Sequence, residues 1–232
     1  MTLDGFHALK HAVRFGAEVE AVVCAHREAV LRLAAALAPD LVPWLEAHLE
    51  PVGPGALTRL LPRPHPTGVV AVARRPAATA GALHRALERA PAVLLDRPRA
   101  LGNVGAVVRV AAAAGAAGVL VTGEADPWHR AAVRGAAGLG WALPFVGTVE
   151  DLPEGVELVA VDPEGEPLGP EAIREGTVLA FGSERHGLSR RIRERAARCV
   201  SIPMTPGVSS LNLATAVAVV LYQWRLGRSP GR

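Results

Sequence analysis

Three short segments after residue 100 carry polar side chains at spacings that could hold a negatively charged substrate. The first is an N-x-G-x-x-x-R pattern at residues 103–109, and the second is a G-x-E-x-x-G-L pattern at residues 182–188. The third begins with I-P-M at residues 202–204 and continues with S-L-N at residues 210–212. Together they supply an arginine, a carboxylate, two amides and a hydroxyl.

These side chains suit the positioning of a phosphate and the groups beside it. Arg109 carries a guanidinium, which can bind phosphate oxygens in a bidentate way. Asn103 and Asn212 can each donate and accept hydrogen bonds, so they can orient the arginine or a substrate hydroxyl. Glu184 only accepts when ionised and suits a guanidinium partner, while Ser210 can contact a substrate or cap the helix that follows. Structural roles stay open as well, with Asn103 as a helix cap and Glu184 as a link between loops.

The segments follow stretches that have the pattern of buried strands. Apolar runs typical of strands covered on both faces occupy residues 92–96, 118–122, 158–161, 177–181 and 199–202. Helical stretches alternate with them at residues 104–114, 127–135 and 211–226. This alternation predicts an α/β fold with a parallel sheet. Because ligands bind beyond the carboxyl ends of the strands in such sheets, we expect the three segments to meet there.

The first part of the chain has the pattern of a smaller α/β unit. Helices are expected at residues 5–15, 25–37 and 57–61 and strands at residues 19–24 and 68–73, with residues 44–52 ambiguous. Residues 74–81 are rich in Pro, Ala and Gly and have no periodicity, which is typical of a linker. We therefore divide the chain into an α/β unit at residues 1–76, a linker and helix at 77–90, and a larger α/β unit at 91–232.

The composition excludes several classes of protein. The 232 residues are 50% hydrophobic and 20% charged, which argues against a disordered chain or a disulfide-stapled mini-protein. The formal charge is +3, and Lys10 is the only lysine, so arginine supplies nearly all of the positive charge. Cys24 and Cys199 lack any CxxC spacing, so we expect no metal site and a reducing, cytoplasmic location.

No targeting or membrane segment is expected either. The first residues carry charges and histidines where a signal peptide needs an apolar core. One uncharged run, residues 199–224, is long enough to span a membrane, but it contains prolines, serines and an asparagine. Such residues would need partners inside a bilayer. The run is therefore interpreted as a loop followed by a buried helix.

The order and spacing of the three segments resemble the pattern of the SpoU (TrmH-type) RNA 2'-O-ribose methyltransferases of the SPOUT superfamily. The match covers about residues 91–224. The resemblance implies an α/β catalytic domain with a deep trefoil knot near its carboxyl end, an exception to the usual rules of chain connection. It also implies S-adenosyl-L-methionine as the cofactor and RNA as the substrate.

Site residues carry over from the family by position. The resemblance implies a catalytic role for Asn103, Arg109, Glu184, Ser210 and Asn212. It implies contacts with the cofactor, largely through backbone groups, for Thr122, Gly182, Ile202, Met204 and Leu211. At Gly182 the missing Cβ would let an adenosine approach closely.

Two features of the site are left open at this point. Arg109 either takes the proton of the 2'-hydroxyl or binds the phosphate beside the target ribose and polarises that hydroxyl; an arginine pKa above about 12 makes it a poor base. Residues Arg185 and His186 stand where relatives often carry a glycine and an acidic residue. They either face RNA or form a solvated loop tip.

Residues 5–13 and 65–73 resemble the small substrate-binding domain of the family's ribosomal RNA methyltransferases, so ribosomal RNA is favoured over tRNA. The resemblance further implies a homodimer that packs through the knot domain, with an active site that draws on both chains. The expected helix at residues 211–226 is apolar almost all round and must be covered on most sides, which agrees with a second subunit.

Two other functions fit parts of the sequence. A catalytically silent RNA-binding protein of the same fold would keep the architecture, although Arg109, Glu184 and Asn212 are all present. A dinucleotide-dependent oxidoreductase would use Gly102 and Gly105 after a buried strand, but the G-x-G-x-x-G fingerprint is not completed. The methyltransferase therefore explains most of the sequence.

Overall fold

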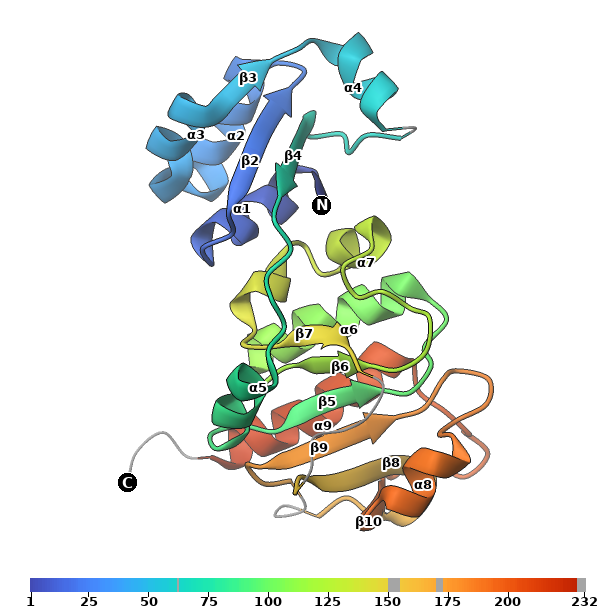
Figure 1. The fold of residues 1–232 in the computed structure, drawn as a ribbon. Helices are drawn as coiled ribbons and strands as arrows, with labels where there is room; N and C mark the ends of the chain where they lie inside the picture. Colours follow the sequence, from blue (N-terminus) through green and yellow to red (C-terminus); the bar gives the residue numbers. More distant parts are fainter. Residues whose placement is uncertain (62, 150–154, 170–172, 229–232) are drawn as a thin grey trace.

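The computed structural model describes residues 1–61, 63–149, 155–169 and 173–228 and shows two lobes, each built on its own sheet (Figure 1). The N-terminal lobe has a four-stranded sheet in the order β1-β4-β2-β3. The pairs β1–β4 and β2–β4 are antiparallel, and β2–β3 is parallel. Its strands are β1 (Thr2–Asp4), β2 (Val19–Cys24), β3 (Leu49–Pro51) and β4 (Val69–Ala73).

Helices of the N-terminal lobe connect these strands. They are α1 (Phe6–Arg14), α2 (Arg27–Leu37), the 3-10 helix η1 (Pro39–Leu41), α3 (Val42–His48) and α4 (Pro54–Leu60). The apolar face of α1 is buried at Phe6, Leu9 and Ala12, in the periodicity of an amphipathic helix. The ambiguous stretch at residues 44–52 thus divides into the end of α3 and the edge strand β3.

The C-terminal lobe holds a six-stranded sheet in the order β10-β8-β9-β5-β6-β7, in which every neighbouring pair is parallel. The central strands β5 and β9 are buried along their whole length, as expected for a sheet covered on both faces. The strands are β5 (Ala92–Leu95), β6 (Val119–Val121), β7 (Val146–Thr148), β8 (Glu157–Pro167), β9 (Thr177–Phe181) and β10 (Arg198–Ser201).

Helices lie on both sides of this sheet. Figure 1 shows α5 and α8 in front of the strands and α6 and α9 behind them. The helices are α5 (Ala80–Leu87), α6 (Leu101–Ala114), α7 (Arg130–Gly135), the 3-10 helix η2 (Leu139–Ala142), α8 (Arg190–Arg195) and α9 (Leu213–Gly227). The predicted α/β architecture with a parallel sheet is confirmed. The trefoil knot stays a prediction.

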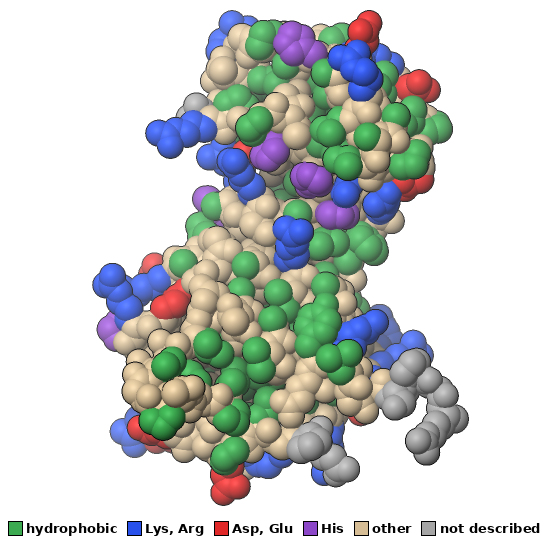
Figure 2. Space-filling model, turned by 180° about the vertical axis from the view of Figure 1, so that it is seen from behind, with side chains coloured by type: hydrophobic (Ala, Val, Ile, Leu, Met, Phe, Trp, Pro, Cys, Tyr) green, Lys and Arg blue, Asp and Glu red, His purple; other side chains and the backbone are tan. Residues whose placement is uncertain are grey.

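One face of α9 is exposed although it is apolar. Val219, Tyr222 and Leu226 follow one another at helical spacing and are all exposed, Leu226 to 78%. Val208 and Leu211 in the preceding loop are exposed as well. Figure 2 views the molecule from this side and shows hydrophobic side chains gathered over the lower lobe. The opposite face of α9 is buried through Val217, Val220 and Leu221. The helix is therefore apolar on both faces, as expected, but only one of them is covered by the rest of the chain.

Several predicted boundaries were wrong, and side-chain caps explain three of them. The helix expected from residue 211 begins at Leu213 because the side chain of Asn212 accepts hydrogen bonds at its start. The helix expected from residue 127 begins at Arg130 because His129 caps it, and α5 begins inside the expected linker because Thr79 caps it. Strands β1 and β7 and helix α8 were not expected at all.

The two lobes are in direct contact. His11 Nδ1 of α1 lies 2.7 Å from the carbonyl oxygen of Ala137, and Arg134 of α7 pairs with the buried carboxylate of Asp4. At Gly138, which has a φ of +74°, a Cβ atom would lie 2.1 Å from the carbonyl oxygen of Ala8. Only glycine allows this approach, so the main chain itself sets the distance between the lobes. None of the helices in the described ranges is long and apolar enough to cross a membrane.

Candidate active site

A pocket of about 460 Å³ lies beyond the carboxyl ends of β9 and β10, at the start of α9. The second and third sequence segments supply most of its wall. Of the predicted site residues, those that line it are Gly182, Glu184, Ile202, Met204, Ser210, Leu211 and Asn212. The expectation that these segments meet at one edge of the sheet is in agreement with this geometry.

A tight loop forms one side of the pocket. Ser183 and Gly187 exchange backbone hydrogen bonds of 3.1 and 3.0 Å, and Gly187 has a φ of +60°. A Cβ atom at Gly182 would lie 2.1 Å from the carbonyl carbon of Gly187 and 2.3 Å from the nitrogen of Leu188. The sequence interpretation, in which Gly182 leaves room for an adenosine, therefore needs a correction. The glycine is required by the loop's own backbone.

A chain of side-chain hydrogen bonds joins all three segments. Asn103 Nδ2 donates to Glu184 Oε1 at 2.7 Å, and Asn212 Nδ2 donates to Asn103 Oδ1 at 3.3 Å. Asn212 Oδ1 in turn accepts from the backbone of Ala214 and Thr215, which caps α9. Asn103 lies in the first turn of α6 and is not its cap. Glu184 pairs with an amide rather than with the guanidinium expected from the sequence.

Ser210 lines the same pocket with an exposed side chain. It does not cap α9, because the side chain of Asn212 takes that role. Its hydroxyl is therefore available to a molecule in the pocket.

Asp96 supports the loop that lines the pocket, and the sequence analysis missed it. Its carboxylate is only 2% exposed and accepts from the backbone N–H of Ser189 at 2.6 Å and from the hydroxyl of Thr122 at 2.9 Å. It thereby ties the loop that follows β9 to the ends of β5 and β6. The available signal was a charged residue that ends a fully apolar run.

Thr122 is not brought into the pocket. Its hydroxyl donates to Asp96 and accepts from the backbone N–H of Arg97 at 3.1 Å. The side chain is buried, and the pocket wall does not include it. Thr122 thus stabilises the residues that follow β5, and the geometry does not support its expected contact with a cofactor.

Arg109 lies outside the pocket wall as well. It projects from α6 with an exposed side chain, and its guanidinium makes no hydrogen bond or ion pair with any residue that the structure describes. The pKa of His7 on α1 is lowered, first by partial burial and then by the nearby charges of Lys10, His65 and Arg109. Arg109 therefore lies within electrostatic reach of His7 in the N-terminal lobe.

Gly105, in the first segment, serves helix packing. A Cβ atom there would lie 2.2 Å from the carbonyl oxygen of Ala132 and 2.9 Å from Cα of Gly135, both on α7. The glycine allows α6 and α7 to cross in close contact. A dinucleotide site built on Gly102 and Gly105 therefore has no support, because Gly105 faces a helix and not an open cleft.

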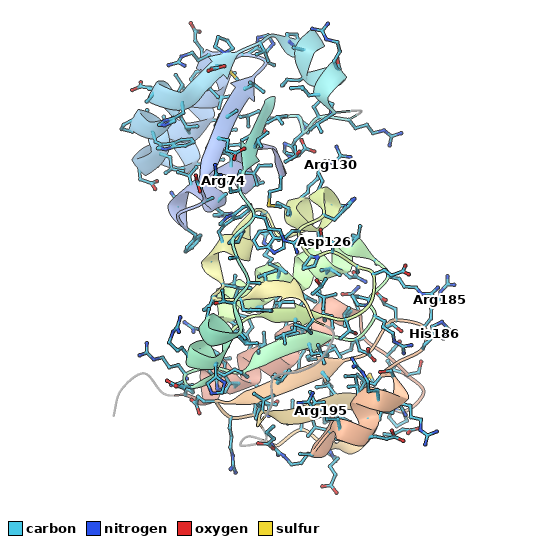
Figure 3. The ribbon with its side chains drawn as sticks, in the orientation of Figure 1. Arg74, Asp126, Arg130, Arg185, His186 and Arg195 are labelled. Atoms are coloured by element: carbon cyan, nitrogen blue, oxygen red, sulfur yellow. The ribbon has the colours of Figure 1, made fainter. Side chains whose placement is uncertain are left out.

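Arg185 and His186 form the tip of the loop that follows Gly182. Both are exposed, and Figure 3 shows them at the outer edge of the lower lobe. Arg185 lines the pocket, whereas His186 does not.

Comparisons with protein families, curated proteins and solved structures agree with one another. The model of the SpoU rRNA Methylase family matches residues 90–222. The 23S rRNA (uridine(2479)-2'-O)-methyltransferase of Streptomyces viridochromogenes is 35% identical over 187 residues, which cover 72% of this chain and 63% of that protein. An uncharacterised tRNA/rRNA methyltransferase of Synechocystis is also 35% identical, over 57% of this chain and 52% of that protein. The chain thus spans about half to two thirds of the length of these curated relatives.

A solved structure is similar over the whole chain. The crystal structure of the SpoU methyltransferase AviRb from Streptomyces viridochromogenes, in complex with the cofactor AdoMet, superposes with a TM-score of 0.77 at 27% identity. The superposition covers 100% of this chain and 91% of that one. The likeness therefore includes both lobes, whereas the family model matches the C-terminal lobe.

Proposed function

We propose, since the chain belongs to the SpoU rRNA methylase family, that it transfers a methyl group from S-adenosyl-L-methionine to a ribose 2'-hydroxyl of RNA. The family that the three motifs predicted is confirmed. The observation that carries the proposal is the hydrogen-bonded chain from Glu184 through Asn103 to Asn212 at the mouth of one pocket. Ribosomal RNA is our proposed substrate because the named relative from Streptomyces viridochromogenes acts on it.

The pocket fits the proposed cofactor in size and chemistry. Its volume of about 460 Å³ lies within the range of small-molecule sites. Apolar side chains of Phe181, Ile202 and Leu211 offer a surface for an adenine ring, and the loop at residues 182–188 offers backbone polar groups. We propose Gly182, Ile202, Met204 and Leu211 as the cofactor-binding residues.

The side chains of the protein have to carry out the other parts of the reaction. When bound, S-adenosyl-L-methionine supplies a methyl group already activated by a positively charged sulfur. The protein has to orient the ribose and accept the proton of its 2'-hydroxyl. Asn103 is held from both sides, by Glu184 and Asn212, so its amide has a fixed orientation. Ser210 offers a hydroxyl on the same wall that has no hydrogen-bond partner among the described residues. Arg109 either accepts the proton or binds the adjacent phosphate.

A homodimer would bring Arg109 to the pocket. Within one chain Arg109 is outside the pocket wall, yet the sequence resemblance implies a catalytic role for it. The exposed apolar face of α9, with Val219, Tyr222 and Leu226, lies on the same lobe. We propose that two copies pack through this face and that Arg109 of the partner subunit completes each site. Light scattering at micromolar concentration should give about twice the mass of 24.2 kDa.

The N-terminal lobe is proposed as the RNA-binding domain, with the division at residues 1–76, 77–90 and 91–232 expected from the sequence. Its Lys10 and His65, together with Arg109 of the other lobe, lie close enough to His7 to lower the pKa of that histidine further. Figure 2 shows blue and purple side chains gathered where the two lobes meet. Such a surface suits an RNA backbone that extends from this lobe to the pocket. A cytoplasmic location follows from the proposed substrate.

Mapping of 2'-O-methyl positions in total RNA tests the proposal in cells. A strain without the gene should lose methylation at one or a few ribosomal RNA positions, and the gene should restore them. An unchanged map, together with measurable RNA binding by the protein, would support the catalytically silent RNA-binding alternative.

A further inference from the structure

Arg185 is the one Arg or Lys side chain in the wall of the pocket, as far as the described residues show. Two carboxylates share that wall, and both are engaged elsewhere. Asp162 accepts from Arg193 Nη2 at 3.0 Å, and Glu184 accepts from Asn103 at 2.7 Å. Neither carboxylate forms an ion pair with Arg185 among the described residues.

The side chain of Arg185 is available to a ligand. It is exposed, and it forms no hydrogen bond or ion pair with the residues placed in the structure. Figure 3 shows it at the outer edge of the lobe, away from the sheet. A free guanidinium with five donors in a planar fork is suited to an oxyanion.

The loop that carries Arg185 is rigidly built. Ser183 and Gly187 bond to each other through their backbones, and the N–H of His186 lies 3.3 Å from Ser183 Oγ. Asp96 holds the following residue Ser189 through a hydrogen bond of 2.6 Å. A cation on such a loop is positioned before the substrate arrives, so less conformational freedom is lost on binding.

We propose that Arg185 binds one of the two RNA phosphates that flank the target ribose, a contact separate from any made by Arg109, and so positions that ribose at the pocket. This inference rests on the proposed function. The cofactor's carboxylate is another oxyanion that a guanidinium could bind. Phosphate is favoured because Arg185 stands at the exposed rim, where a polymer must pass, and because RNA presents one phosphate at every nucleotide.

The test compares Arg185→Gln with two matched variants of the full-length protein. Arg185→Lys keeps the charge, and Arg190→Gln removes an exposed arginine that is paired with Glu194 on α8. Arg185→Gln should weaken binding of a ribosomal RNA fragment about tenfold, the size expected for one charge-assisted contact. It should also lower the slope of log affinity against log salt by about one. Calorimetry should show affinity for S-adenosyl-L-methionine unchanged within twofold.

The variants separate the possible results. Arg185→Lys should recover part of the RNA affinity, and Arg190→Gln should leave both ligands unaffected. If Arg185→Gln weakens cofactor binding and not RNA binding, the anion is the cofactor's carboxylate and the proposal is overturned. Equal behaviour of Arg185→Gln and Arg190→Gln would also overturn it, because the tip would then be merely solvated. A wild-type protein that binds RNA through Arg185 but transfers no methyl group would contradict the proposed function alone.

Discussion

Asn212 has two structural functions, and each uses a different atom of its side chain. The oxygen Oδ1 accepts from the backbone N–H groups of Ala214 and Thr215 at the start of α9. The nitrogen Nδ2 donates to Asn103, which in turn donates to Glu184. The residue therefore couples the end of the third segment to the first and the second.

Two substitutions at Asn212 should separate these functions. Asn212→Ala removes the cap and should lower the free energy of unfolding by about 1 kcal/mol. Asn212→Asp keeps a capping oxygen but turns an acceptor towards Asn103 Oδ1, so stability should be retained while methyl transfer falls by at least about tenfold. Urea unfolding and initial rates measure the two effects. Full activity of Asn212→Asp would show that the bond to Asn103 has no part in the reaction.

At the residue scale, the sequence predicted which residues lie at the site better than it predicted the role of each residue. The second and third motifs identified most of the residues in the pocket wall, because motif spacing reflects loops at one sheet edge. The first motif identified Asn103, which bonds to Glu184 and Asn212. The prediction that Gly182 makes room for an adenosine was wrong. The backbone of Gly182 approaches that of Gly187 across the loop, and such an approach leaves no pattern in the sequence. Asp96 was missed for a related reason: a buried carboxylate is recognisable only when its distant partners, Thr122 and Ser189, are known.

Helix α6 shows how one element positions several parts of the site. Its first turn carries Asn103 towards Glu184, and Arg109 projects from an exposed face. Val104, Val107 and Val108 are buried in the core. Gly105 meets α7 at a distance that no side chain would allow. The orientation of Asn103 and Arg109 therefore depends on the crossing of α6 and α7.

A pair of glycine substitutions in α6 tests this dependence. Gly105→Ala places a Cβ atom against the carbonyl of Ala132 and should cost about 1–3 kcal/mol of unfolding free energy through overpacking. Gly102→Ala is the matched control, because its Cβ would have no neighbour within 4 Å. It should be neutral or stabilising by up to about 1 kcal/mol, since alanine favours the helix. Thermal unfolding of the two variants gives the comparison, and equal stabilities would contradict the packing role of Gly105.

At the element scale, the long apolar runs were predictable and the short elements were not. The strands β2 and β9 begin and end where the sequence pattern indicated. In β9 every residue is buried, and burial of this kind imposes a continuous apolar run. Strands β1 and β7 have three residues each, too few for a period to emerge. Helix α8 buries only Ile192 among its arginines and so lacks an amphipathic pattern.

The contact between the lobes makes the stability of the whole molecule sensitive to pH. Burial lowers the pKa of His11, which lies against the carbonyl of Ala137 in the other lobe, and burial likewise lowers the pKa of His7. Below pH 6.5 the unfolded chain therefore takes up protons more readily than the folded chain.

The free energy of unfolding should consequently decrease as the pH is lowered from 7 through 6.5 towards the folded-state pKa values of the two histidines. Urea titrations at constant ionic strength between pH 7.5 and 5, set around the ordinary histidine pKa of about 6.5, measure this change. His11→Gln should flatten the dependence. Stability that stays constant or increases on acidification would contradict the account of the interface.

The proposed active site, shared between two chains, leads to a prediction about mixed dimers. Arg109→Ala and Asn212→Ala should each be nearly inactive, with losses of about a hundredfold or more in rate for Arg109→Ala. When the two inactive chains are unfolded together and refolded, some mixed dimers should hold one site with both native residues. The rate of methyl transfer per mixed dimer should then approach the rate of one native active site. No recovery, despite dimers of the right mass, would mean that Arg109 acts within its own chain.

Direct transfer of a labelled methyl group tests the central claim. Purified protein is incubated with S-adenosyl-L-methionine labelled in its methyl group and with ribosomal RNA transcribed in vitro, which carries no modification. The account predicts that the label enters the RNA at a ribose 2'-oxygen, so that alkaline hydrolysis leaves one labelled dinucleotide uncut, and that Arg109→Ala abolishes the incorporation while still binding the cofactor. Label on a base, or no transfer by a dimer that binds both ligands, would contradict it.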